Sequence, residues 1–289
     1  MAIKRMDDEP GMPGSLSYQE EMDVTDSAVI YEKIGRTALI TLNRPQKRNA
    51  FEAAINQALP AAVKAARDDR SVRSVVLTGA GGAFCSGFDL GSLEAGEDAA
   101  FAGRNLVLGF HDWFSGLIDM EKPVIAAVDG VAVGAGFSLA LAADFIFVTP
   151  RARLLPSFLS LGLVPDLSML HVLPRLVGLA KAKEIIFSAR PIDAEQAVAL
   201  GLAQAVIPEG QLLDSALQFA VQFDDAPADA LGMAKTLLNR SFETDRQAMN
   251  QFEAAAQSLC GASGYHAEAV RRFLAKEGLP YRGAVRPAP

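Results

Sequence analysis

The stretch KPVIAAVDGVAVGAG, residues 122–136, carries the pattern that decides the fold. Its apolar first half is typical of a strand that a parallel sheet buries on both faces. Glycines at 130, 134 and 136 then turn the chain into a helix that begins near Gly134. A second stretch, VRSVVLTGAGGAFCSGFDL at residues 72–90, has the same order of buried strand and glycine-rich loop. One such loop can be a simple turn, but two side by side can aim main-chain N–H groups at one oxygen, as in an oxyanion hole.

The sequence on either side of these stretches completes an α/β pattern. Further strands are predicted at Val29–Glu32, Thr37–Leu42, Phe145–Val148 and Ala203–Ile207. Helices are predicted at residues 50–68, 98–119, 167–176, 179–188, 193–200, 210–223, 226–239 and 246–274. We therefore predict an α/β core over residues 27–208 and a helical C-terminal region over 209–289. Residues 1–26, with two basic and seven acidic side chains, are predicted to form an acidic flexible arm.

Composition limits the classes of function. Half of the 289 residues are hydrophobic and 21% are charged, which excludes a disordered chain. A net charge of −7 argues against a nucleic-acid partner. No apolar run is long enough to span a membrane and the N-terminus lacks a signal peptide, so we expect a cytoplasmic protein. Cys85 and Cys260 have no metal-site spacing and are predicted to be free thiols, and no metal site is predicted.

Several motifs together resemble the enoyl-CoA hydratase/isomerase (crotonase) superfamily. They are Asn43-Arg-Pro45 with Arg48-Asn-Ala50, Gly82–Asp89, residues 122–136, Leu161–Asp166, Leu173–Gly178 and Ala194–Ala203. The resemblance runs from about residue 28 to the C-terminus. It implies a spiral of ββα units, a helical C-terminal trimerisation region, and a homotrimer or hexamer. It also implies an acyl-CoA thioester as substrate, with coenzyme A part of that substrate and no separate cofactor.

The resemblance further implies roles for individual residues. The thioester oxygen is expected to be held by the main-chain N–H groups of Ser86 and Ala135. Contacts with the CoA part of the substrate are expected from Arg48, Gly87, Phe88, Asp89, Gly134, Lys276 and Tyr281. Asp89 is also expected to fix its loop through hydrogen bonds.

Carboxylates distinguish the members of the superfamily. The two positions where a hydratase carries glutamates hold Ser138 and Phe158, so hydration of an enoyl thioester is not expected. Asp166 stands where dienoyl-CoA isomerases and the ring-1,2-epoxyphenylacetyl-CoA isomerase group have a catalytic aspartate. We therefore expect Asp166 to act as the acid/base of an isomerase. The alternative role is an N-cap for the helix that follows. The sequence departs from the isomerase group at residues 167–169, where Leu-Ser-Met replaces small glycines and is expected to reshape the acyl pocket.

The preferred function is thus an acyl-CoA isomerase that shifts a double bond, or opens a strained ring, through an oxyanion-stabilised dienolate. One alternative is a hydrolase or dehalogenase with Asp166 as nucleophile, which needs a histidine to activate water. The other alternative is a non-catalytic acyl-CoA binder. The three histidines, His111, His171 and His266, are interpreted as core, interface or surface residues, so the hydrolase alternative lacks its base.

Overall fold

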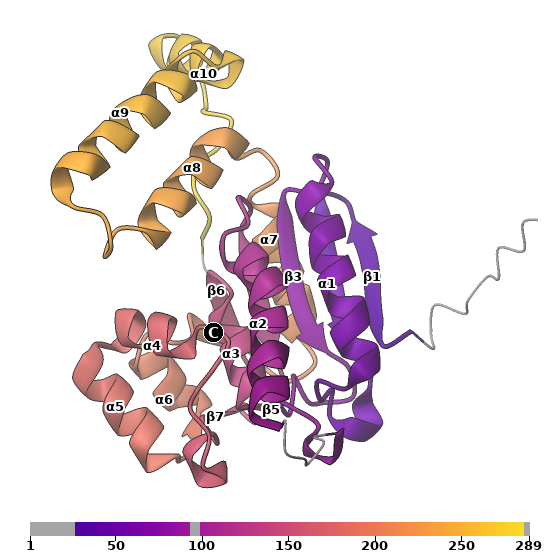
Figure 1. Ribbon diagram of the computed structural model, residues 1–289. Helices are drawn as coiled ribbons and strands as arrows, with labels where there is room; N and C mark the ends of the chain where they lie inside the picture. The colour runs from indigo at the N-terminus through magenta and orange to yellow at the C-terminus, as the bar shows by residue number, and fades with distance from the viewer. Residues whose placement is uncertain (1–26, 93–98, 286–289) are drawn as a thin grey trace, which may run out of the picture.

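The computed structural model describes residues 27–92 and 99–285 of the chain. The predicted acidic arm at residues 1–26 lies outside this part. Figure 1 shows a twisted sheet with helices on both faces and a group of C-terminal helices that extends beyond it.

Six strands form the main sheet, in the order β1-β2-β3-β4-β6-β9. Their bounds are β1 (Val29–Ile34), β2 (Thr37–Leu42), β3 (Ser74–Gly79), β4 (Val124–Val128), β6 (Phe145–Val148) and β9 (Ala205–Val206). The first two strands form an antiparallel hairpin, and every later pair of neighbours is parallel. The predicted α/β fold class is confirmed.

The central strands alternate their side chains between two hydrophobic layers. Leu77 belongs to the layer under α1 (Ala53–Asp68) and α2 (Ala99–Ile118), whereas its neighbour Val76 belongs to the layer under α7 (Leu212–Val221). Because helices cover both faces, as Figure 1 shows, the inner strands have no solvent-facing side. This is why β4 and the centre of β3, Val75–Leu77, are uninterrupted apolar runs in the sequence.

A smaller sheet stands beside the main one. Its strands are β5 (Val131–Val133), β7 (Arg153–Leu155) and β8 (Ile192–Asp193), in the order β5-β7-β8. Its helices are α3 (Ala135–Leu141), α4 (Met169–Val177), α5 (Leu179–Ser188) and α6 (Ala194–Ala199). These strands have two or three residues each, too few for a periodic pattern, and the sequence does not predict them.

The C-terminal region does not separate cleanly from the core. The predicted boundary after residue 208 falls just before α7, and α7 is itself a layer on the main sheet. The next helix, α8 (Ala228–Asn239), is tied to the core by the Lys235 ammonium, which lies 2.6 Å from the Asp144 carboxylate. The last two helices, α9 (Arg246–Gly261) and α10 (Gly264–Leu274), follow α8 and lie beyond the sheet.

The prediction of a single helix over residues 246–274 is wrong. The chain forms two helices, α9 and α10, with a break at Ala262 and Ser263. The Ser263 hydroxyl accepts a hydrogen bond from the His266 N–H at 3.1 Å and so caps the second helix. A serine with glycine beside it is a start signal for a helix, and here that signal prevails over the continuous apolar spacing.

In the described ranges, no helix combines the length and apolarity that a bilayer crossing requires. Both cysteines are free. Burial raises the pKa of the Cys85 thiol to about 12, so it stays protonated and serves as a packing group.

Candidate active site

Two glycine-rich loops meet where β3 and β4 end. The Cys85 N–H donates to the Val131 carbonyl at 3.0 Å, and the Val133 N–H donates back to the Cys85 carbonyl at 2.9 Å. Since β3 and β4 are parallel neighbours, their carboxyl ends lie at one edge of the sheet. The predicted side-by-side arrangement of the loops is confirmed.

Glycine at two positions lets these loops approach main chain to main chain. A Cβ atom on Gly136 would lie 2.2 Å from the Cys85 carbonyl oxygen, and one on Gly87 would lie 2.6 Å from the Val133 carbonyl oxygen. Gly87 also has a φ of 85°, which favours glycine. The same Cβ on Gly87 would lie 3.5 Å from the Ala135 nitrogen. The first loop therefore lies directly against the start of α3.

The structure corrects the predicted donor at Ser86. Its N–H already donates to the Arg48 carbonyl at 2.9 Å and is not available to a substrate oxygen. Arg48 and Asn49 both have left-handed φ values, 50° and 57°. The buried Asn49 amide donates to the Ala80 and Ala83 carbonyls at 2.9 and 2.7 Å. The turn at Arg48 and Asn49 thus holds the first glycine-rich loop in place through hydrogen bonds. The Arg48 side chain itself is exposed.

Phe88 on the first loop and Ala135 at the start of α3 are candidate donors to a substrate oxygen. Neither of them donates a main-chain hydrogen bond to any residue in the two described ranges. The Phe51 N–H donates to the Gly87 carbonyl at 2.8 Å, and the Asp89 N–H donates to the Phe51 carbonyl at 3.3 Å. Because these bonds flank Phe88, its own N–H turns away from Phe51. No sequence pattern separates Phe88 from Ser86, since the distinction depends on which distant carbonyl is already paired.

Charged side chains fix the outer part of the first loop. The Asp89 carboxylate lies 2.8 Å from the Lys47 ammonium and accepts from the Gly91 N–H at 3.1 Å. Lys47 also lies 2.9 Å from Glu52. The Lys47 ammonium and the Gly91 N–H hold the pKa of Asp89 below its usual value. The hydrogen bonds expected of Asp89 are therefore present, and its contact with CoA stays a prediction.

A cavity of about 520 Å³ opens beside these loops. Phe88 comes from the first loop, Asp166 from the segment before α4, and His111 from α2. The other lining side chains are apolar, apart from Arg104 and a glycine; among them are Leu106, Val107, Leu108, Phe158, Leu163 and Val164. Asp166 is the one carboxylate among the lining residues of the two described ranges.

Asp166 is a partly buried carboxyl group with an unsatisfied oxygen. Burial raises its pKa to about 6. Its Oδ1 atom is buried and accepts no hydrogen bond within the described ranges. The alternative role as a helix cap is wrong, because α4 begins at Met169 and its cap residue is Ser168. Asp166 supports that turn only through its main-chain carbonyl, which accepts from the Met169 N–H at 3.1 Å.

Ser138 and Phe158, at the positions where the resemblance leads us to expect hydratase glutamates, cannot take a proton near neutral pH. The buried Ser138 hydroxyl donates to the Asp166 carbonyl at 3.0 Å, so it holds the segment that carries the carboxylate. The Phe158 side chain is 5% exposed and lines the cavity. A Cβ on Gly134 would lie 3.9 Å from the Phe158 ring, which puts that ring beside the second loop.

The departure at residues 167–169 affects the backbone more than the cavity. Leu167 and Ser168 have φ values of 47° and 62°, a region where glycine is favoured. Leu167 and Met169 are fully buried in the core, and neither lines the cavity. The expected reshaping of the acyl pocket by residues 167–169 stays a prediction.

His111 is a site residue that the sequence interpretation missed. It lines the same cavity as Asp166, and its Nε2 atom is buried without a partner in the described part of the chain. Its spacing with Arg104, Val107 and Leu108 gives one face of α2, but only the fold shows that this face meets the segment containing Asp166. The other two histidines lie elsewhere: His171 is 3.8 Å from Glu243, and His266 is exposed.

Lys276 and Tyr281 are not brought to this cavity within one chain. Both follow α10, and Tyr281 packs beside α7 on the far hydrophobic layer. Their contact with CoA stays a prediction.

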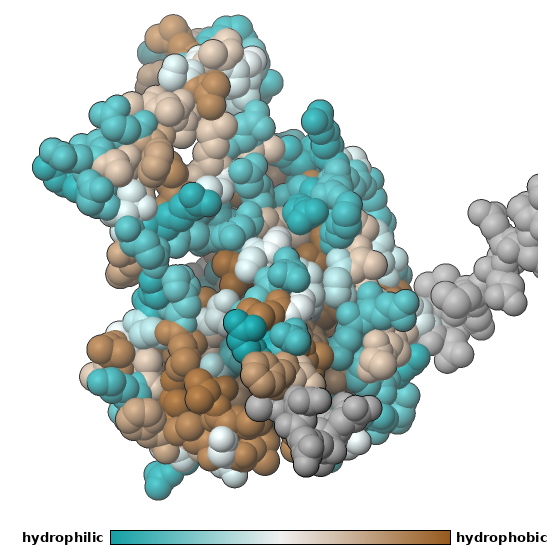
Figure 2. All heavy atoms as spheres, viewed as in Figure 1, coloured by the Kyte–Doolittle hydropathy of each residue, from teal (hydrophilic) through white to brown (hydrophobic). Residues whose placement is uncertain are grey.

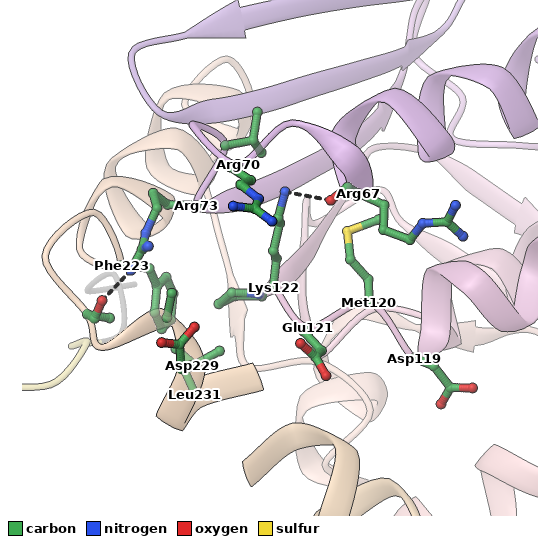
Figure 3. Close-up of a pocket in the computed structure, with 14 residues that line it drawn as sticks. Arg67, Arg70, Arg73, Asp119, Met120, Glu121, Lys122, Phe223, Asp229 and Leu231 are labelled. Carbon is green, nitrogen blue, oxygen red and sulfur yellow. Dashed lines mark hydrogen bonds between the residues drawn. The ribbon is translucent and has the colours of Figure 1, made fainter. Parts of the chain in front are cut away.

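A second and larger hollow, of about 740 Å³, lies at the opposite ends of β3 and β4 (Figure 3). The Lys122 ammonium there donates to three main-chain carbonyls, those of Ala66, Arg67 and Asp69, at 2.6 to 2.9 Å. Arg73 donates to the Ala226 carbonyl. These cations serve the protein's own backbone, so the hollow does not resemble a catalytic centre. Among the described residues, no cluster of three or more His, Cys, Asp or Glu is able to hold a metal ion.

Known proteins that are similar to this chain in sequence or in structure point to one family. The sequence model of the enoyl-CoA hydratase/isomerase family matches residues 32–284. The chain is 33% identical to the 1,2-epoxyphenylacetyl-CoA isomerase of Escherichia coli (strain K12), covering 84% of this chain and 94% of the relative. It is 35% identical to a probable enoyl-CoA hydratase of Rhodobacter capsulatus (88% and 97% covered) and 30% identical to the 4-chlorobenzoyl coenzyme A dehalogenase-2 of an Arthrobacter species (88% and 92% covered). The crystal structure of an enoyl-CoA hydratase/isomerase from Cupriavidus metallidurans CH34 is similar, with a TM-score of 0.83, 37% identity, and 90% and 98% of the two chains covered.

Proposed function

Because the chain belongs to the enoyl-CoA hydratase/isomerase (crotonase) family of acyl-CoA enzymes, we propose that it is an isomerase acting next to a CoA thioester. The observation that carries this proposal is the cavity's content of carboxylates. Among the described lining residues Asp166 is the only carboxylate, and Ser138 and Phe158 stand where the sequence comparison with the family leads us to expect the hydratase glutamates. One carboxylate can move a proton between two carbons, whereas the hydratase chemistry positions water with two.

In this proposal the thioester oxygen accepts hydrogen bonds from the N–H groups of Phe88 and Ala135. The Asp166 carboxylate removes a proton from a carbon of the acyl group, and the electron pair moves through the conjugated system onto the thioester oxygen. The Asp166 carboxyl exchanges its proton with water and then gives a proton to a carbon two positions away, which regenerates the carboxylate. A buried, preorganised donor of this kind is typically worth a factor of about 10²–10³ in rate.

The state of Asp166 supports the acid/base role. A pKa of about 6 leaves the group mostly ionised at neutral pH, while its conjugate acid is strong enough to return the proton. The absence of a helix-capping bond to its carboxylate also counts against the binder alternative, in which Asp166 is only structural.

The position of His111 supports a second candidate function. A hydrolase or dehalogenase with Asp166 as nucleophile needs a histidine to activate water, and His111 lines the cavity that Asp166 lines. No hydrogen bond joins the two side chains, which is why the isomerase remains the first proposal.

The proposed function predicts exchange of substrate hydrogen with solvent. Thioesters of 2-enoyl, 3-enoyl and aryl acids, incubated with the enzyme in deuterium oxide, are expected to gain deuterium and change absorbance without gaining water. Mass spectrometry of the products checks this. Addition of water would indicate a hydratase, release of free CoA, or of halide from a haloaryl thioester, would indicate the second candidate, and no change with any thioester would indicate a binder.

We also propose that the protein assembles as a trimer or hexamer. Large apolar side chains are exposed on the C-terminal helices and the turn between them, for example Leu238, Phe242, Leu259, Phe273 and Leu274, each at least 65% exposed. Figure 2 shows a further apolar area beside α4 and α5. Burying such side chains is favourable at about 25 cal/mol per Å². Light scattering is expected to give the mass of three or six chains, and a stable monomer at micromolar concentration would refute the assembly.

A further inference from the structure

The cavity beside the loops has a buried polar atom that the proposed mechanism does not use, the Nε2 of His111. The atom is buried and has no hydrogen-bond partner in either described range. A buried polar atom of this kind normally has a hydrogen-bond partner. An unpaired one indicates that a bound molecule supplies the partner. The Asp166 oxygen in the same condition is explained by the proton it transfers. His111 needs an explanation of its own.

Packing holds the turn of α2 that carries His111. The neighbouring Phe110 is 4% exposed, and its ring centroid lies 4.9 Å from that of Phe88 and 5.7 Å from that of Phe51. Trp113, on the other side of His111, lies 6.3 Å from Phe110. These rings connect the histidine to the loop whose N–H is proposed to hold the thioester oxygen. His111 is therefore fixed relative to the bound acyl group.

Among the described lining residues, only Asp166 could pair with His111, and no hydrogen bond joins the two side chains. The lining residues on α2 next to it, Val107 and Leu108, are apolar, and so are Leu163 and Val164 on the opposite segment. Arg104 lies about 10 Å away along the helix, at about 1.5 Å per residue, and is exposed. A leucine would serve as well as histidine for packing in such a lining. The polar atom is consistent with a substrate that brings a polar atom of its own.

We infer that His111 selects acyl-CoA thioesters whose acyl group carries a hydrogen-bonding oxygen away from the thioester. This inference rests on the proposed function only in taking the cavity as the acyl site. The imidazole can donate to a carbonyl or ether oxygen, or accept from a hydroxyl, according to its tautomer. A plain hydrocarbon acyl group would leave Nε2 unpaired, and such a mismatch typically costs tenfold or more in specificity, about 10–100-fold here.

The test uses saturated acyl-CoA thioesters, which bind without reacting. Pairs of equal chain length, plain or with a hydroxyl group moved along the chain, are titrated by calorimetry. The wild-type protein is expected to bind one member of the hydroxyl series about 10–100-fold more tightly than its plain partner. His111→Leu is expected to remove that preference and leave the affinity for the plain thioester within about threefold, while His111→Gln restores part of it. His171→Leu, the matched change at an exposed histidine outside the cavity, is expected to have no effect.

Three outcomes would overturn the inference: no preference in the wild-type protein anywhere in the series, a preference that survives in His111→Leu, or equal weakening of both members of a pair in that variant. The deuterium-exchange assay separates this result from the proposed function. Exchange by the wild-type protein on plain enoyl thioesters tests that function, whereas the calorimetric comparison needs no turnover. If His111→Leu instead abolishes release of free CoA, His111 is the base of the second candidate and not a selectivity residue.

Discussion

Asp166→Asn is expected to reduce both isomerisation and solvent-deuterium exchange by about 10³-fold or more, since the amide cannot accept the substrate proton. The substitution keeps the shape of the side chain. The Asp166 carboxylate caps no helix and its buried oxygen has no partner, so the free energy of unfolding should change by no more than about 1 kcal/mol. Exchange by mass spectrometry and denaturant unfolding of the same preparation measure the two effects.

Asp119→Asn is the matched control, because it makes the same chemical change in the hollow at the opposite ends of the strands. It is expected to leave exchange unchanged. In the wild-type enzyme the exchange rate should fall as pH drops through about 6, because protonation of Asp166 removes the base, and should level off above that value. Full exchange activity in a folded Asp166→Asn protein would show that the base lies elsewhere.

Gly87→Ala is expected to damage both stability and activity. The new Cβ would lie 2.6 Å from the Val133 carbonyl oxygen, and crowding of this kind costs about 1–3 kcal/mol. The φ of 85° adds about 1–2 kcal/mol for a residue with a side chain. Relief of the clash must separate the first loop from α3, so the two proposed donors no longer converge and exchange should fall by about 10²-fold or more. Thermal unfolding and the exchange assay report the two losses.

Gly35→Ala isolates the part of this effect that comes from the backbone alone. Gly35 also has a positive φ, 60°, but a Cβ there would meet no atom within 4 Å. That variant should lose only about 1–2 kcal/mol and keep its activity. Equal losses in the two variants would mean that contact between the loops does not matter.

The sequence predicts the strands and loops that form the site better than the individual groups that act in it. The buried runs of β3 and β4, and the glycines after them, have local signatures, so the two loops and their common edge are predictable. The free donor is not, because Ser86 and Phe88 differ only in that the Arg48 carbonyl, far along the chain, takes the N–H of the first. His111 was missed for a related reason. Its helical spacing is visible, but the segment that closes the cavity against it comes 50 residues later.

The prediction that Asp166 could cap the following helix is wrong for a local reason. Proline and aspartate before an apolar helix are a start signal, yet Leu167 and Ser168 take left-handed conformations and delay α4 until Met169. Two side-chain-bearing residues in that region are uncommon, and no propensity scale anticipates them.

The weak packing of the last two helices determines how an isolated chain opens by local unfolding. Every strand of the main sheet contributes to a core, whereas α9 and α10 contain no buried residue. Few contacts would be lost if these two helices unfolded while the sheet stayed intact. An isolated chain therefore has two levels of cooperativity, a sheet whose amide hydrogens exchange only on global unfolding and a terminal segment whose amides exchange through partial opening. Any association that covers α9 and α10 would merge the two levels into one.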